Sequence, residues 1–127
     1  MAMSLDVTLY TPRRQFVACN HCGGTIEVEV KGEEVFEANI THNLGEMARE
    51  AGIYGIVWRP EENGIERAAQ IIDPLRKGVE DIRARREHYE QFNSPNGWGL
   101  YKNFLPWLER YLTACAGWPD AKVEVSR

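Results

Sequence analysis

The sequence predicts an α+β domain in which a small antiparallel sheet carries helices on one face. In the first third of the chain, apolar and polar residues alternate as they do in half-buried strands. From Thr41 onward, apolar residues recur at the three- and four-residue spacing of a helix face. Alternation returns briefly near the end, and strands followed by helices and a last strand are typical of this fold class.

The predicted sheet uses four short segments of the first third and one near the end. The first strand covers residues 5–9, and a second covers residues 15–18. The clearest alternation lies in residues 26–30, and a turn at residues 32–33 lets residues 35–38 return antiparallel. A closing strand, built on Val123 and Val125, is expected to join this N-terminal sheet.

Three helical stretches are predicted between these strands. Residues 41–51 form the first, with Thr41 as N-cap, and a short apolar segment that stops at Arg59-Pro60 follows. Residues 65–86 form the second, with a kink or two abutting helices at Pro74. Residues 100–116 form the third, whose regular part begins at Pro106 if that proline breaks its first turns. The inner faces are Ala68, Ile71, Ile72, Leu75, Val79 and Ile82 in the second helix, and Phe104, Leu108, Tyr111, Leu112 and Cys115 in the third.

Length and composition indicate one domain. A chain of 127 residues with 43% apolar residues fits a single core, divided into mainly strands at 1–38, mainly helices at 39–117 and a closing strand at 121–126. No apolar run approaches the ~18 residues of a membrane span, and no signal-peptide layout begins the chain. With an odd cysteine count as well, the expected location is the cytoplasm. A net charge of −4 and interleaved acidic and basic residues argue against a nucleic-acid partner.

Cys19 and Cys22 are the candidate metal ligands, spaced as in half of a zinc knuckle. A structural zinc needs four ligands, and the sequence contains no second pair of this kind. We therefore expect no cofactor, and a reduced surface turn without metal is one interpretation. A four-thiolate zinc site shared across a homodimer and a redox pair are the alternatives.

Candidate ligand-binding residues lie in three motifs. Thr41, His42 and Asn43 open a helix, where free backbone N–H groups attract anions, although capping alone also explains Thr41. Two loops place a tryptophan beside polar groups, and such a ring stacks on a base while an arginine clamps a phosphate or carboxylate. The alternative is a loop anchored by a buried indole, with its arginine paired to a neighbouring glutamate. The candidates in these loops are Trp58, Arg59 and Glu61, and Asn96, Trp98 and Tyr101.

Catalytic motifs are missing from the sequence. None of its serines lies in a nucleophile elbow, and no glycine-rich phosphate loop is present. Acid–base chemistry by His42 with Glu61 or Glu62 depends on the fold bringing these residues together. We therefore name no catalytic residue, and an enzyme remains an alternative that the sequence does not favour.

The chain from about residue 36 onward resembles a group of small uncharacterised proteins encoded by phages and prophages. The matching stretches are ANITHNL at 38–44, AGIY at 51–54, WRPEE at 58–62 and NGWG at 96–99, and the opening MSLDV at 3–7 is also similar. Together they cover about 100 residues. The cysteine turn departs from the short N-termini of that group, so the resemblance implies no metal.

The resemblance implies a protein that acts on a bacterial host from within the host cytoplasm. One physical route is to sequester a nucleotide-derived immune signal, binding it tightly without turnover as a sponge does. Paired sites in a symmetric homo-oligomer favour such binding. Two alternatives from other classes are a protein-interaction module that binds a host or phage protein and a small enzyme that uses His42 as acid or base.

Overall fold

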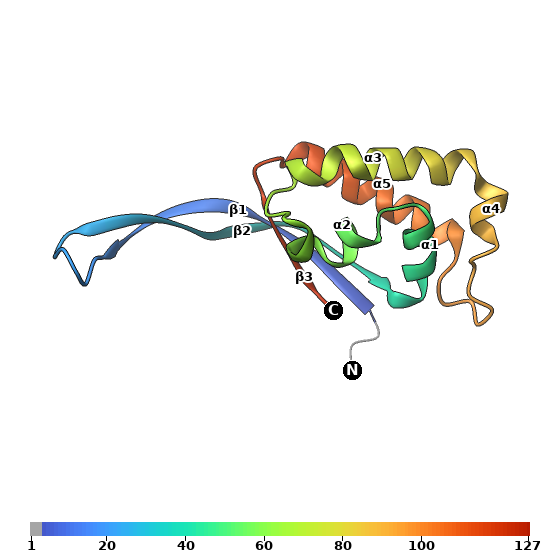
Figure 1. The fold of residues 1–127 in the computed structure, drawn as a ribbon, viewed down its shortest axis with the longest axis horizontal. Coiled ribbons are helices and arrows are strands. Elements are labelled where there is room, and N and C mark those ends of the chain that lie inside the picture. The colour runs from blue at the N-terminus through green and yellow to red at the C-terminus, as the bar shows by residue number, and fades with distance from the viewer. Residues whose placement is uncertain (1–3) are drawn as a thin grey trace.

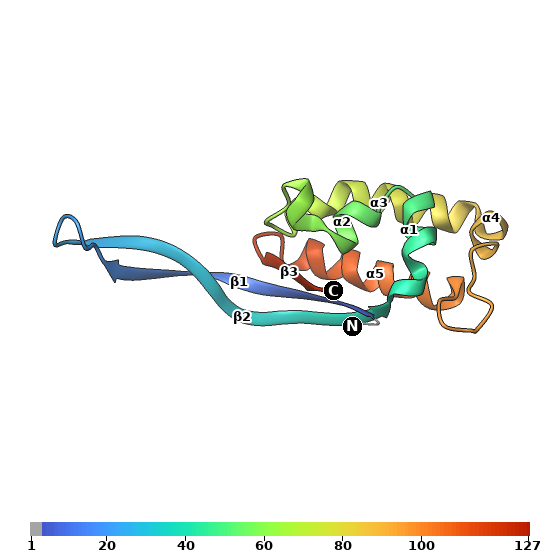
Figure 2. The same cartoon turned by 60° about the horizontal axis from the view of Figure 1, so that its bottom comes forward.

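A three-stranded antiparallel sheet forms one layer of the computed structural model, which describes residues 4–127. Strand β1 (Ser4–Ala18) lies between β2 (Thr25–Thr41) and β3 (Lys122–Ser126). The helices cover one face of the sheet, as Figure 2 shows. The predicted α+β fold is therefore confirmed, including the closing strand, in which Val125 pairs with Val7.

The first two strands are far longer than predicted, because each is one element where we expected two. Strand β3 pairs with β1 only from Asp6 to Tyr10, and beyond this point β1 pairs with β2 alone. The hairpin of residues 11–33 projects from the rest of the molecule (Figure 1). We call residues 11–33 the arm and the remainder the body.

The turn predicted at residues 32–33 is wrong, since an irregularity in the pairing of β1 and β2 occurs there instead. The register shifts between Leu9 and Pro12, opposite these residues. A Cβ on Gly32 would lie only 2.6 Å from the carbonyl oxygen of Thr11, so only glycine fits this approach. The Glu33 backbone N–H donates to Thr11 Oγ1 over 2.9 Å. This irregularity marks the base of the arm.

The helical layer begins where β2 ends. The first predicted helix comprises η1 (His42–Leu44) and α1 (Gly45–Glu50), and the apolar segment after it is α2 (Tyr54–Trp58), followed by η2 (Pro60–Asn63). The two long helices are α3 (Ala69–Ala84) and α5 (Tyr101–Gly117), with the short α4 (Arg86–Glu90) between them. Within residues 4–127 no helix has the length and apolar character needed to cross a membrane.

Pro74 does not divide the second predicted helix in two, and Pro106 does not delay the start of the third, because α3 and α5 continue through these residues. Both prolines are exposed, so their rings face solvent. A proline inside a helix costs about 3 kcal/mol. Buried side chains on both sides of each proline offset that cost: Ile71 and Leu75 in α3, and Phe104 and Leu108 in α5.

The core lies between the sheet and the two long helices. Leu5, Val7 and Leu9 of β1 are fully buried, as their alternation predicted. The predicted inner faces of α3 and α5 are also buried, except that Ile72 and Leu112 lie at the edge of the core. The arm contributes nothing to this cluster.

Gly78 allows α3 to approach the segment between α1 and α2. A Cβ at this position would lie 2.3 Å from Cγ2 of Ile53, whose side chain is buried. Glycine to alanine in an exposed helix stabilises it by about 1 kcal/mol, but overpacking a core costs about 1–3 kcal/mol. We expect Gly78→Ala to lower the free energy of unfolding in urea. The matched control is Gly117→Ala, where a Cβ meets no atom within 4 Å; equal stability for both variants would contradict the prediction.

Candidate functional site

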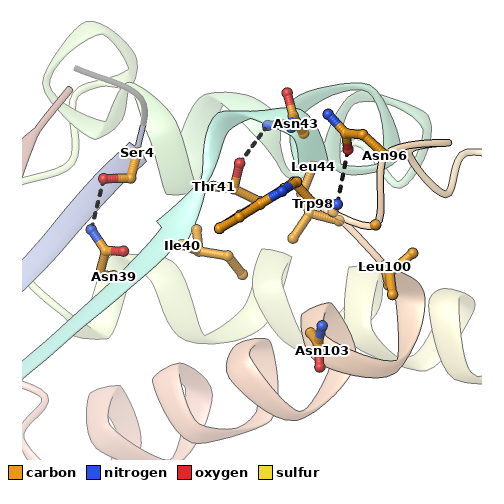
Figure 3. A pocket seen from close by; sticks show the side chains of 12 residues that line it. Ser4, Asn39, Ile40, Thr41, Asn43, Leu44, Asn96, Trp98, Leu100 and Asn103 are labelled. Atoms are coloured by element: carbon orange, nitrogen blue, oxygen red, sulfur yellow. Dashed lines mark hydrogen bonds between the residues drawn. The ribbon is translucent and has the colours of Figure 1, made fainter. Parts of the chain in front are cut away.

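A pocket of about 740 Å³ opens where the end of β2, η1 and the loop before α5 meet. Figure 3 shows the side chains around it, drawn from β1, β2, η1, this loop and α5. Its volume lies within the range of small-molecule sites. The lining residues are Ser4, Asn39, Ile40, Thr41, Asn43, Leu44, Asn96, Gly97, Trp98, Gly99, Leu100 and Asn103.

The β2 side of the pocket is shaped by a cap. Thr41 ends β2 with an extended backbone, and its Oγ1 accepts a hydrogen bond from the Asn43 N–H at 3.2 Å. The predicted N-cap is therefore confirmed, although it caps a 3-10 turn rather than an α-helix. This turn directs Asn43 toward the pocket while Leu44 packs into the core.

The opposite wall is a loop, residues 94–99, that closes on itself. The Ser94 N–H donates to the Gly99 carbonyl at 2.9 Å, and the Gly97 N–H donates to the Ser94 carbonyl at 3.1 Å. Asn96 Oδ1 accepts from the Ser94 hydroxyl at 2.6 Å and from the Trp98 N–H at 2.9 Å. These bonds hold the loop in one conformation and present the Trp98 side chain outward.

Gly99 joins the two walls. Its φ of 128° lies in the region that favours glycine, and a Cβ there would be 2.9 Å from Cβ of Asn43. The backbone of the NGWG motif therefore packs directly against the ANITHNL motif. Two of the three predicted motifs share one pocket as a result.

The lining is polar without being charged. Four asparagines contribute amide groups, and none of the lining residues carries a formal charge. Asn39 donates to Ser4 Oγ at 2.9 Å and to Asp6 Oδ1 at 2.7 Å, whereas the side-chain amides of Asn43 and Asn103 form no hydrogen bond within residues 4–127. Beside them Trp98 is 70% exposed, and it lines the same pocket as Thr41 and Leu44 (Figure 3). The site therefore offers a flat aromatic ring and free amide donors and acceptors.

Comparison of the chain with protein-family models, with curated proteins and with solved structures finds no match. The resemblance to phage and prophage proteins therefore stays a prediction.

Trp58, a predicted ligand-stacking residue, is a core residue. Its side chain is 1% exposed, stacks on Tyr54 with ring centroids 5.4 Å apart, and meets Phe104 edge-on at 6.2 Å. Its indole N–H donates to Nδ1 of His42 at 3.0 Å. A ligand has no access to this ring, so the anchoring interpretation holds for Trp58.

His42 supports the core on one side and faces a smaller pocket on the other. Because its Nδ1 accepts from Trp58, the neutral ring carries its proton on Nε2. The side chain also lines a second pocket of about 400 Å³, together with Arg49 and Asn93. Asn43 lines both pockets, so the two adjoin. Within residues 4–127, His42 makes no hydrogen bond or ion pair with Glu61 or Glu62.

Arg59, Glu61 and Tyr101 are not among the residues that line the main pocket. The Arg59 guanidinium pairs with the Glu62 carboxylate at 2.5 Å, and Glu61 pairs with Arg127. Tyr101 is buried, and its hydroxyl donates to the Ile82 carbonyl at 2.8 Å. Burial raises the pKa of Tyr101, and no charged atom of Arg59 reaches the pocket.

The turn at the tip of the arm holds the two candidate metal ligands. The Cys22 N–H donates to Sγ of Cys19 at 3.4 Å. Hydrogen bonds from Cys22 and from the backbone of His21 lower the pKa of the Cys19 thiol. Cys115, by contrast, lies in the core, where burial raises the pKa of its thiol to about 12.

Sequence reasoning missed several pocket residues. Ser4, Leu100 and Asn103 were not singled out, although each lies within a few residues of a predicted motif or strand. Asn103 stands two residues after Tyr101, on the exposed side of the first turn of α5. A polar side chain directly before the apolar Phe104, at the start of a helix, was the signal available for it.

Proposed function

We propose that the protein binds the nucleoside part of a small nucleotide-derived ligand in the main pocket and holds it without converting it. The observation that carries the proposal is the exposed Trp98 ring beside uncharged amide side chains. A base stacks on such a ring, and amides such as those of Asn43 and Asn103 pair with base or ribose edges. A neutral lining suits these groups better than it suits a phosphate.

The second pocket is where the phosphates of such a ligand would bind. Arg49 and His42 line it, and the Arg49 guanidinium lies 4.0 Å from the centre of the Tyr54 ring. Asn43 belongs to both pockets, so a ligand with its base on Trp98 extends toward Arg49. Glu46 also lines the second pocket and limits how much negative charge it accepts.

The resemblance to phage and prophage proteins supports sequestration of a host immune signal as the role. Catalysis has less support. His42 shares its Nδ1 with Trp58, and the two glutamates weighed as its partners are paired with arginines. Binding without turnover is therefore the function that we propose.

A thermal-shift screen against nucleosides, nucleotides, cyclic dinucleotides, NAD and ADP-ribose tests the proposal. A ligand at 100 times its dissociation constant stabilises the folded state by about 2.7 kcal/mol. For a domain of this size the unfolding midpoint should rise by about 5–15 °C. The expected result is one class that raises the midpoint and is recovered unchanged. A flat screen contradicts the proposal and favours a protein partner, and consumption of the ligand favours an enzyme.

A further inference from the structure

The tip of the arm is the feature that the proposed function leaves unused. The turn of residues 19–24 lies at the end of the arm farthest from the helices (Figure 1). Both cysteines of this turn are free thiols, Cys22 exposed and Cys19 partly so. A long hairpin thus carries two thiol side chains away from the core, where packing does not require them.

Hydrogen bonds to the backbone and to the sulfur of Cys19 hold this turn together. The Cys19 N–H donates to the Gly24 carbonyl at 2.8 Å, and the Gly23 N–H donates to the Cys19 carbonyl at 3.2 Å. Gly23 has a φ of 74°, which lets the chain turn back directly after Cys22. The N–H that Cys22 donates to Sγ of Cys19 is the kind of outer contact that orients a metal-bound thiolate.

We propose that Cys19 and Cys22 are half of a structural zinc site, and that a second copy of this chain completes it with the same two cysteines. Structural zinc takes four ligands in a tetrahedron, and thiolates two residues apart are a common pair. Within residues 4–127, no three or more His, Cys, Asp or Glu side chains gather as a metal site, so one chain supplies only two ligands here. The third cysteine, Cys115, is buried in α5.

A second copy is the occupant that fits, because two identical pairs related by a two-fold axis make four thiolates. The length of the arm lets two tips meet while the bodies stay apart (Figure 1). Large apolar side chains next to the turn also lack cover: Phe16 is 70% exposed and Ile26 is 49% exposed. Ile26 pairs with Val17 and therefore shares its face of the ribbon, whereas the preceding residue, Phe16, points to the other face. Phe16 and Ile26 thus lie on opposite faces of the ribbon, close to the two cysteines. A second tip bound through zinc would cover part of this apolar surface.

The test measures zinc content and molar mass together on the full chain. Protein purified with Zn²⁺ present is analysed by elemental mass spectrometry and by size-exclusion chromatography with light scattering, before and after EDTA. The expected result is one zinc per two chains in a dimer, which chelation converts to monomers. Cys19→Ser with Cys22→Ser should abolish both zinc and dimer while leaving the thermal midpoint of the body unchanged, because the arm lies outside the core.

His21→Ala is the matched control, since it changes the same turn without removing a thiolate. It should retain the zinc content and the dimer. The proposal would be overturned by the absence of zinc from protein whose thiols are reduced, by one zinc per chain in a monomer, or by a dimer that survives both serine substitutions. A Cys19–Cys22 disulfide in protein purified under reducing conditions would overturn it in favour of a redox pair.

Discussion

Replacement of Trp58 by alanine is expected to lower the free energy of unfolding by about 3–5 kcal/mol, the usual range for a buried large aromatic. The ring is buried between Tyr54 and Phe104, so its loss leaves a cavity in the layer that supports η1. The free energy of unfolding of natural domains is only about 5–15 kcal/mol, so this one substitution removes a large share of the stability. Urea denaturation followed by circular dichroism measures it.

Two further variants help to interpret the loss of stability in Trp58→Ala. One removes only the hydrogen-bond acceptor of Trp58, and the other removes a more exposed tryptophan. His42→Ala removes the acceptor of the indole N–H, and leaving that group unpaired should cost about 1–3 kcal/mol. Trp118→Ala removes a tryptophan that is 46% exposed, and it should lower stability by clearly less than Trp58→Ala does, because less apolar surface is lost. If Trp58→Ala were as stable as Trp118→Ala, Trp58 would not be the core residue described above.

Trp98→Ala is expected to weaken ligand binding by about 5–150-fold, the equivalent of about 1–3 kcal/mol for one stacked base. The fold should tolerate the change, because the side chain is 70% exposed and the loop is held by backbone and Asn96 hydrogen bonds. Isothermal titration with the ligand class identified by thermal shift measures the affinity. Trp118→Ala is the matched control and should bind normally.

Arg59→Ala provides a second comparison for the site. The sequence offered Arg59 either as a clamp for a phosphate or carboxylate or as the partner of a neighbouring glutamate, and its guanidinium is paired with Glu62 outside the pocket. We therefore expect this variant to bind with unchanged affinity. Normal binding by Trp98→Ala would remove the main support for the pocket, and loss of binding in Arg59→Ala would show that the ligand extends beyond it.

The fold was predictable where burial follows local periodicity, and unpredictable where it depends on distant partners. The alternation of Leu5, Val7 and Leu9 identified a half-buried strand, and the structure buries all three. The same alternation at residues 26–30 also predicted a strand, yet these residues lie in the arm, outside the core. Period alone cannot distinguish a strand that faces a core from one that projects from it. Gly32 was predicted to lie in a turn because glycine is common in turns. The structure instead requires glycine there for a close approach to Thr11 of the opposite strand, which the local sequence does not reveal.

The site was predicted in part, because its motifs were visible but their arrangement was not. Residues 41–43 and 96–99 stood out in the sequence, and in the structure a contact between Gly99 and Asn43 brings these two segments together. The sequence left open which tryptophan packs. The residues next to each tryptophan distinguish the two: Trp58 follows Ile56 and Val57, whereas Trp98 stands between two glycines. An indole at the end of an apolar run tends to be buried, and one between glycines has no adjacent apolar side chain to cover it.

The central position of β1 has a consequence for the order in which the protein folds. One of its neighbours, β2, follows it closely in the chain, whereas the other, β3, comes after every helix. During synthesis, β1 and β2 can pair early, but one edge of β1 stays open until the ribosome has released the last strand. Contacts between such distant segments form slowly, because a long loop must close before they are made. The hairpin is therefore expected to form first, and the sheet to close last, after the helices have begun to pack.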